Sequence, residues 1–355
     1  MKLNKIFAIA LCALCFTACS DDDDAPEVLQ VYTGGYVLNQ GNMSKNIPGS
    51  LTNIDTENGQ VFQDVFQNAN KRVLGDTPNS AIKYGTRMYI AVERSNTIEV
   101  VNDSTTKCLK TIIPDASAGK SPRCFAAKDR YVYVSMYDGY VSRIDTVSLK
   151  INATVKVGPN PEEMAIAGNY LYVTNSDGQN WNDNYANGYT VSKINLSTFT
   201  EEKKINVGMN PTKIVSNGTD VFVISMGDYS SVNPATLKQI KEDDSVETLF
   251  NAGLMAINGD KLYCVYAPYT KKDEPAIPPT YYEYVISTKV KTELQLANII
   301  SPVAIGINPS TGNIFVSSYS VEYGYSDPCI VNEYSSTGTF LKKYDVGVGA
   351  GCFVF

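Results

Sequence analysis

The feature that most constrains the fold is a short pattern that recurs seven times along the chain. Each copy begins with a proline or a small residue and has a large apolar residue three positions later, as in "PEEMAI" (161–166). Successive apolar residues are 43, 39, 50, 41, 50 and 48 positions apart. A period in this range is typical of arrays in which each repeat is one small structural unit. The apolar residues are Ile82, Phe125, Met164, Ile214, Met255, Ile305 and Phe353.

Every copy except the last is followed by a tight Gly, Asn or Asp turn and a second segment rich in aromatic and β-branched residues. Examples are "RMYIAV" (87–92) and "YLYVTN" (170–175), and third segments such as "TIEVVN" (97–102) follow. Alternation and turn residues of this kind predict strands rather than helices. Four strands in a repeat of this length predict the blade of a β-propeller.

The two ends of the chain each supply part of one blade. The segments "GYVLNQ" (35–40), "SLTNID" (50–55) and "QVFQDVF" (60–66) match second to fourth strands, whereas "AGCFVF" (350–355) is a first strand without a successor. We therefore predict an all-β, seven-bladed β-propeller, closed by pairing of the C-terminal strand with the N-terminal strands in one blade. Such closure leaves no open seam between the ends of the ring. The predicted domain spans residues 28–355.

The N-terminus predicts export and lipid anchoring. Residues 1–18 combine two lysines, an apolar run and small residues, which are the three parts of a signal peptide. Cys19 follows as in a bacterial lipobox, where the thiol is acylated; an ordinary secretory signal that is cleaved elsewhere is the alternative. Residues 19–27 form an acidic tether, and the aspartates at 21–24 resemble the surface-export signal of Bacteroidota lipoproteins. Four like charges would also act as a self-repelling spacer.

Composition excludes several kinds of chemistry. The 355-residue chain has 24 tyrosines, one tryptophan and no histidine, so Ser-His-Asp and Cys-His catalysis and zinc sites with histidine ligands are excluded. A formal net charge of −7 disfavours nucleic acid as a partner. The first strands carry only two carboxylates, Glu162 and Glu163, and neighbours in a strand should point to opposite faces. A glycosidase needs two carboxylates on either side of one bond, so we expect a protein that is not an enzyme and has no cofactor or metal.

Two smaller features leave alternatives open. The stretch "SDGQNWNDN" (176–184) offers oxygen atoms to calcium, although its spacing is not that of a defined calcium loop. The cysteines that follow the signal have no CxxC spacing and predict mostly buried, unpaired thiols, with one disulfide remaining open. They are Cys108, Cys124, Cys264, Cys329 and Cys352.

The long loops all fall on one face of the predicted ring. In a propeller, the loops that join second to third strands lie on the same face as the loops between blades, and here they include "SDGQNWNDNYANG" (176–188) and "APYTKKDEPAIPPT" (267–280). Aromatic side chains offer contact area at a low entropy cost, and amides fix a ligand's orientation. The predicted ligand-binding residues are Asn42, Arg94, Tyr137, Trp181, Tyr185, Tyr229, Tyr269, Tyr319 and Tyr325. The same loops carry Tyr281, Tyr282, Tyr323, Asn180, Asn182 and Asp183.

These residues also have structural interpretations. A compact loop is often packed by its own side chains, so any of the tyrosines could serve to hold its loop. Arg72 and Asp76, in the blade-joining loop "NKRVLGDT" (70–77), are expected on the same face, where they form either an ion pair that holds the loop or a ligand contact.

The sequence resembles a known group of propellers. "YLYVTN" contains the tetrapeptide that names the YVTN-repeat (YncE-like) propellers, and "GGYVLNQGN" (34–42), "VFQNANKRVLGDTPNS" (65–80) and the acidic lipoprotein start look like the BtuG surface lipoproteins of Bacteroidota. The resemblance implies an outer-membrane, cell-surface protein, anchored only through its lipid. It also implies capture of cobalamin (vitamin B12) or related corrinoids, and transfer to a TonB-dependent outer-membrane transporter of the BtuB kind. The alternative function is a non-catalytic protein- or glycan-binding scaffold.

Overall fold

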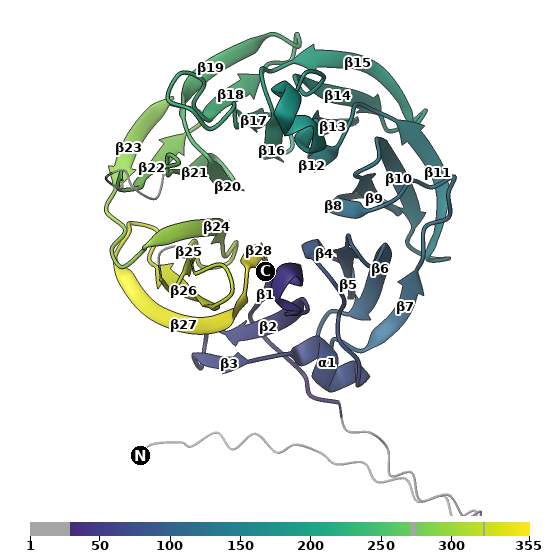
Figure 1. Cartoon of the computed structure of the whole chain (residues 1–355), viewed down its shortest axis with the longest axis vertical. Coiled ribbons are helices and arrows are strands. Elements are labelled where there is room, and N and C mark those ends of the chain that lie inside the picture. Colours follow the sequence, from purple (N-terminus) through teal and green to yellow (C-terminus); the bar gives the residue numbers. More distant parts are fainter. Residues whose placement is uncertain (1–28, 271–274, 276, 322–323) are drawn as a thin grey trace, which may run out of the picture.

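The computed structural model describes residues 29–270, 275, 277–321 and 324–355, and it confirms the predicted fold. Seven four-stranded antiparallel sheets stand around a central axis (Figure 1). We number the blades along the chain, so that blade 1 contains the N-terminal strands. The predicted lipidation site, Cys19, and the aspartates after it lie outside the described residues.

Blade 1 closes the ring as predicted, because strands from both ends of the chain share one sheet. The C-terminal strand β28 (Ala350–Val354) is its innermost strand and pairs antiparallel with β1 (Gly35–Asn39), followed by β2 (Ser50–Asp55) and β3 (Gln60–Phe62). Leu38 lies opposite Cys352 in this pairing. Figure 1 shows the C-terminus near the centre of the ring.

The other six blades each use four consecutive strands, ordered from the centre outward. Blades 2 to 4 contain β4 (Pro78–Tyr84), β5 (Arg87–Val92), β6 (Thr97–Asn102) and β7 (Cys108–Ile112); β8 (Pro122–Lys128), β9 (Tyr131–Met136), β10 (Tyr140–Asp145) and β11 (Lys150–Lys156); and β12 (Pro161–Ala167), β13 (Tyr170–Asn175), β14 (Thr190–Asn195) and β15 (Thr200–Asn206). Blades 5 to 7 contain β16 (Pro211–Ser216), β17 (Val221–Ser225), β18 (Thr236–Ile240) and β19 (Val246–Asn251); β20 (Leu254–Asn258), β21 (Lys261–Tyr266), β22 (Thr280–Val285) and β23 (Val290–Leu294); and β24 (Ser301–Ile307), β25 (Ile314–Tyr319), β26 (Pro328–Tyr334) and β27 (Phe340–Val348).

The hydrophobic core lies between neighbouring blades. Second strands are apolar along nearly their whole length because both of their faces pack against an adjacent blade. In β5, for example, Met88 and Ile90 pack with blade 1, whereas Tyr89 and Ala91 pack with blade 3. The core is therefore a set of inter-blade layers, and the first strands lie nearest the central axis.

One segment differs from the sequence prediction. The run "QVFQDVF" (60–66) is a strand only as far as Phe62, and its last two residues begin the short helix α1 (Val65–Asn70). Val65 and Phe66 are 0% and 1% exposed, and the Thr106 hydroxyl donates a hydrogen bond to the Val65 carbonyl at 2.9 Å. The helix forms because it buries both apolar side chains between blades 1 and 2. This burial depends on tertiary packing, which the alternation of apolar and polar residues in the segment does not reveal.

The recurring sequence pattern marks a β-bulge in the first strand. On β12, Pro161 pairs with Asn175 and Met164 pairs with Val173, so Glu162 and Glu163 together lie opposite one residue, Thr174. The register shifts in the same place on the other first strands that begin near a proline, β4, β8, β16 and β24. A bulge bends the strand and re-aims its side chains. Each bulge lies near the long-loop end of its strand, since the blade-joining loop leads into it.

Two 3-10 helices, η1 (Met43–Lys45) and η2 (Gly178–Asp183), lie in loops on the long-loop face. Over the part of the chain that the structure describes, no helix has the length and apolar character needed to cross a membrane.

Candidate functional site: the long-loop face

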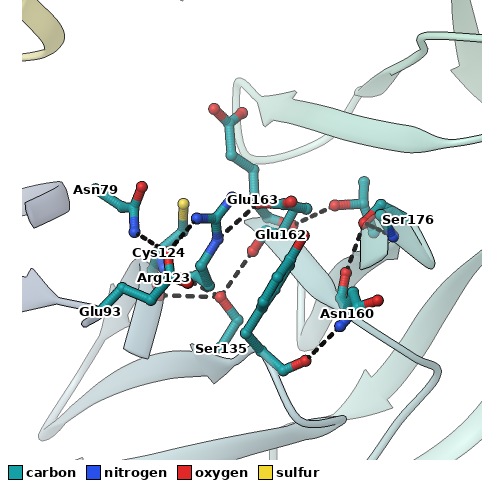
Figure 2. Close-up of polar contacts among 12 residues, drawn as sticks. Asn79, Glu93, Arg123, Cys124, Ser135, Asn160, Glu162, Glu163 and Ser176 are labelled. Carbon is teal, nitrogen blue, oxygen red and sulfur yellow. Dashed lines mark hydrogen bonds and ion pairs between the residues drawn. The ribbon is translucent and has the colours of Figure 1, made fainter. Parts of the chain in front are cut away.

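Four charged side chains from three adjacent first strands line one side of a cavity in the central channel. Arg123 on β8 donates from Nε and Nη2 to Glu162 Oε2 on β12, at 2.9 and 2.6 Å. Its Nη1 donates to Oε2 of Glu93, the residue after β5, at 2.5 Å. Figure 2 shows Arg123 between these two carboxylates, and Asn79 Nδ2 donates to the same Glu93 oxygen, Oε2, at 2.6 Å. Arg123 therefore joins blades 2, 3 and 4.

A second ion pair continues the arrangement into blade 5. Lys213 Nζ on β16 donates to Glu163 Oε1 at 2.7 Å, and the backbone N–H of Ile214 donates to Glu163 Oε2 at 3.1 Å. Glu162 reaches blade 3 and Glu163 reaches blade 5, on opposite sides of blade 4, and yet both line the one cavity. The bulge in β12 is the reason, since it interrupts the strict alternation of a flat strand.

The bulges are themselves held by hydrogen bonds. The Ser135 hydroxyl donates to the Glu162 carbonyl at 2.7 Å (Figure 2). The Thr174 hydroxyl donates to the Glu163 carbonyl at 3.1 Å. These bonds satisfy backbone carbonyls that the sheet ladder leaves without a partner at the bulge. The carboxylates are thus carried on a fixed backbone.

The cavity, which we call the channel cavity, has a volume of about 380 Å³. Its wall is charged on the side of blades 3 to 5 and neutral on the side of blades 1 and 2. The lining residues are Gln40, Asn79, Ser80, Arg123, Cys124, Phe125, Glu162, Glu163, Met164, Thr212, Lys213, Gly351 and Cys352. Their strand positions place the cavity near the long-loop end of the channel.

The charges around the channel cavity balance. Arg94 Nε, at the surface, lies 3.9 Å from Glu93 Oε1, which gives three carboxylates and three cations in contact. Burial raises the pKa of Glu162, although Arg123 opposes the shift. Burial also disfavours the charge on Arg123, but Glu162 and Glu93 outweigh it and raise the pKa of Arg123. The charge of Glu163 raises the pKa of Lys213.

Tyr137, a predicted ligand-binding residue, lies beside this cluster. Its ring stacks on the Arg123 guanidinium at 4.4 Å, and burial raises its pKa. Asn160 donates to the Tyr137 carbonyl at 2.9 Å and fixes the short turn that carries it. Tyr137 and Arg94 thus lie beside the charged cluster, whose members Arg123 and Lys213 were not among the predicted site residues.

A second region of the same face is apolar and aromatic. Tyr229, Tyr269 and Tyr325, from the long loops of blades 5, 6 and 7, border a groove together with Met226 and Ile277. The groove contains two adjoining hollows of about 310 and 280 Å³, and the three tyrosines are 48%, 66% and 52% exposed. We call it the aromatic groove.

Some predicted site residues support the loops that form this face. Asn42 Nδ2 donates to the Tyr325 carbonyl at 3.0 Å and to the Ser326 hydroxyl at 3.1 Å, which ties the loops of blades 1 and 7 together. Tyr319 contacts Tyr325 edge to face, with ring centroids 5.1 Å apart. Tyr185 is 8% exposed, and burial raises its pKa. Asn42 and Tyr319 therefore help to position the exposed Tyr325, whereas Tyr185 is itself buried.

The loop of η2 presents the single tryptophan. Trp181 is 62% exposed, and the loop beneath it is closed by Asp177, which accepts from the Asn187 backbone at 2.9 Å and from Asn180 at 3.2 Å. This carboxylate is therefore used inside the loop rather than presented to an ion. Among the described residues, no group of three or more His, Cys, Asp or Glu could hold a metal.

Several other predicted positions have a different place in the structure. Tyr281 and Tyr282 belong to strand β22 rather than to a loop, and Tyr323 lies outside the described residues. Arg72 pairs with Glu99 of β6 at 2.7 Å, not with Asp76. Glu99 is buried in the strand next to the loop. The Arg72 guanidinium also stacks on the Phe66 ring at 4.8 Å, which directs it towards Glu99.

The five described cysteines are all unpaired. Cys264 and Cys329 are buried, as expected, whereas Cys108, Cys124 and Cys352 are half-buried. Cys124 and Cys352 line the channel cavity, and burial raises the pKa of both thiols.

The fold and this face define the class: a seven-bladed β-propeller with long structured loops and a charged channel end on one side. The sequence matches the family named "Domain of unknown function (DUF5074)" over residues 33–347, so the chain belongs to that family. A search of curated proteins gave no match. A chain of the Kuenenia stuttgartiensis hydrazine synthase is similar in structure, with a TM-score of 0.57 and 12% identity, covering 81% of this chain and 90% of that one. At this identity the likeness shows the fold alone.

Proposed function

We propose that the long-loop face captures cobalamin or a related corrinoid. The aromatic groove is the observation that carries the proposal, because three loops far apart in the sequence bring exposed tyrosines to one place. A corrin ring has flat apolar faces, which aromatic side chains bind well, and a rim of amides that needs hydrogen-bonding groups. The channel cavity lies on the same side of the ring and offers such groups.

In this proposal the protein is a binder and not an enzyme. Each carboxylate at the channel lies within 4 Å of a cation, and Glu163 also accepts a backbone hydrogen bond. A general acid or nucleophile needs a carboxyl group that is free to reach the reacting atom. The balanced pairs instead favour a rigid binding surface.

The cellular setting is part of the proposal. The lipobox-like Cys19 and the acidic tether support a lipid-anchored protein on the outer-membrane surface, which would pass its ligand to a TonB-dependent transporter. Replacing the four aspartates with alanine and treating intact cells with protease tests this address. The proposed export signal predicts that the variant becomes protected from the protease, and unchanged cleavage would contradict it.

A colour assay tests the binding itself. The purified protein is mixed with cyanocobalamin and desalted, and we expect the vitamin's visible absorbance to remain with the protein. A matched variant, Tyr229→Ala with Tyr269→Ala, should retain much less colour than Tyr170→Ala, whose side chain lies on the opposite face of the ring. Loss of colour in the wild-type sample would contradict the proposal.

Glycan binding is the second candidate. Trp181 and Tyr269 are 62% and 66% exposed, and exposed rings of this kind can stack on sugar rings. A panel of soluble polysaccharides, measured by retardation in affinity gels, distinguishes the two. Retardation that disappears in Trp181→Ala, without retention of cobalamin, would favour the glycan scaffold.

A further inference from the structure

The channel cavity has a chemistry of its own, distinct from that of the aromatic groove. Its charged wall places a carboxylate pair on β12 between Arg123 on one side and Lys213 on the other. The opposite wall presents the neutral polar residues Gln40 and Ser80. The charged wall therefore has donors at its two ends and two acceptors between them, around a space of about 380 Å³.

The charge balance limits what this space can bind. Arg123, Glu162, Glu163 and Lys213 are each already paired at 2.6 to 2.7 Å. An entering anion or cation would have to break one of these pairs or remain without a counter-charge, and both cost free energy in a partly desolvated site. A neutral group with separate donor and acceptor ends meets neither cost.

A primary carboxamide has this character. Its carbonyl accepts a hydrogen bond and its NH₂ donates two. The Lys213 ammonium has three N–H groups, of which one donates to Glu163, so it has donors to offer to a carbonyl. Glu162 accepts both bonds from Arg123 at Oε2 and also interacts with the Tyr137 hydroxyl. A carboxylate has about four acceptor sites, so Glu162 keeps the capacity to accept from an amide NH₂.

We propose that the channel cavity is a carboxamide-binding subsite, which takes one amide arm of the ligand while the aromatic groove holds its flat body. The inference deepens the proposed function and rests on it for the identity of the ligand. Lys213 and Glu162 are the specificity-determining residues, because together they recognise both ends of the amide.

A small-molecule probe tests the cavity without cobalamin. The Met164 side chain lines the cavity, and its methyl signal can be assigned in a methyl-labelled sample by comparison with Met164→Leu. We expect propionamide to shift this signal, and propionate and propylammonium to shift it less at equal concentration. An equal or larger response to either charged probe, or no response to propionamide, would overturn the proposal.

Variants test the assigned residues. Glu163→Gln with Lys213→Gln removes one ion pair as a whole, so that no unpaired charge remains. We expect it to weaken propionamide binding about ten-fold, the loss of one hydrogen bond to a charged group. The control is Lys261→Gln with Glu283→Gln, which removes a similar pair (3.0 Å) between β21 and β22 and should leave binding unchanged. Equal weakening by both double variants would contradict the assignment.

Cobalamin derivatives separate this inference from the proposed function. Among cyanocobalamin derivatives with a single amide hydrolysed to the acid, we expect one isomer to bind about ten-fold more weakly than the rest. Equal binding of all isomers would leave cobalamin capture intact and refute the subsite. A protein that responds to propionamide but not to cobalamin would retain the subsite and refute the corrinoid ligand.

Discussion

Replacement of Arg123 by methionine is the sharpest test of the charged cluster. Arg123, Glu93 and Glu162 have side chains that are 19%, 8% and 13% exposed, so the cluster is mostly shielded from water. Arg123→Met keeps an unbranched stem of similar length but leaves two carboxylates without their shared cation. Loss of one partner from a buried pair costs about 3–5 kcal/mol, and we expect the free energy of unfolding to fall by this amount at neutral pH.

The loss should depend on pH. Because burial raises the pKa of Glu162 above its ordinary value of 4.5, this carboxyl favours the folded state at low pH and loses that contribution as the pH rises through the raised pKa. In Arg123→Met the opposing guanidinium is gone, so the pKa of Glu162 rises further. The difference from wild type should therefore be largest at neutral pH and shrink towards pH 4.

Denaturant unfolding followed by far-UV circular dichroism measures this difference at both pH values. Arg130→Met is the matched control, since Arg130 forms a comparably short pair with Asp145 but is 61% exposed and should matter much less. The reasoning would be refuted if Arg123→Met destabilised the protein no more than the control, or by the same amount at neutral and acid pH.

Three further predictions concern the groove, a glycine of blade 1 and the core. Tyr229→Ala and Tyr269→Ala should each weaken cyanocobalamin binding about ten-fold or more in calorimetry, because each removes an aromatic contact. The control Tyr170→Ala should leave the affinity unchanged. Equal affinities of all three variants would count against the groove as the binding site. Gly34→Ala should destabilise the protein by at least about 1–3 kcal/mol, since the φ of Gly34 is +80° and the new Cβ would lie 2.3 Å from the Ile54 carbonyl oxygen. The control Gly85→Ala, at φ +65° with open space around it, should destabilise the protein less. The reverse order of melting temperatures would contradict this account. Burial raises the pKa of the Cys264 thiol to about 12, so iodoacetamide at pH 8 should modify this thiol only after unfolding. Peptide mass spectrometry measures the modification. Modification of Cys264 in the native protein would refute its burial.

The architecture could be predicted from the sequence because the propeller repeats one local pattern. Each second strand is apolar on both faces, and each turn before it carries Gly, Asn or Asp, so every blade gives the same signal independently. The closure of blade 1 followed from counting strands at the two ends, and Leu38 opposite Cys352 confirms it. The sequence prediction was wrong at α1 because the burial of Phe66 depends on contacts with blade 2. The apolar and polar pattern of the segment itself carries no information on those contacts.

The channel cluster was missed for a geometric reason. A proline or small residue followed by an apolar residue three positions later identifies each repeat, but the pattern alone does not show that the strand is bulged there. A bulge brings Glu162 and Glu163 to one cavity. Their ion-pair partners, Arg123 and Lys213, lie 39 and 50 positions away in the sequence, in the neighbouring blades. Aligning the repeats on their bulges places Arg123, Glu162 and Lys213 at neighbouring levels of the channel, a signal that the sequence does contain.

The loop residues were predicted only as a set. Exposure separates Tyr229, Tyr269 and Tyr325 from Tyr185, which is buried, and the difference arises from how each loop folds back on its own blade. Asn42 illustrates the same point, since its partners Tyr325 and Ser326 lie at the other end of the chain. Such contacts exist only once the ring has closed.

Calorimetric titration of the purified protein with cyanocobalamin tests the central claim most directly. We predict binding at one site per chain, weakened by Tyr269→Ala and by Tyr137→Ala and unchanged by Tyr170→Ala. The absence of heat, together with no vitamin retained on desalting, would contradict corrinoid capture by the long-loop face.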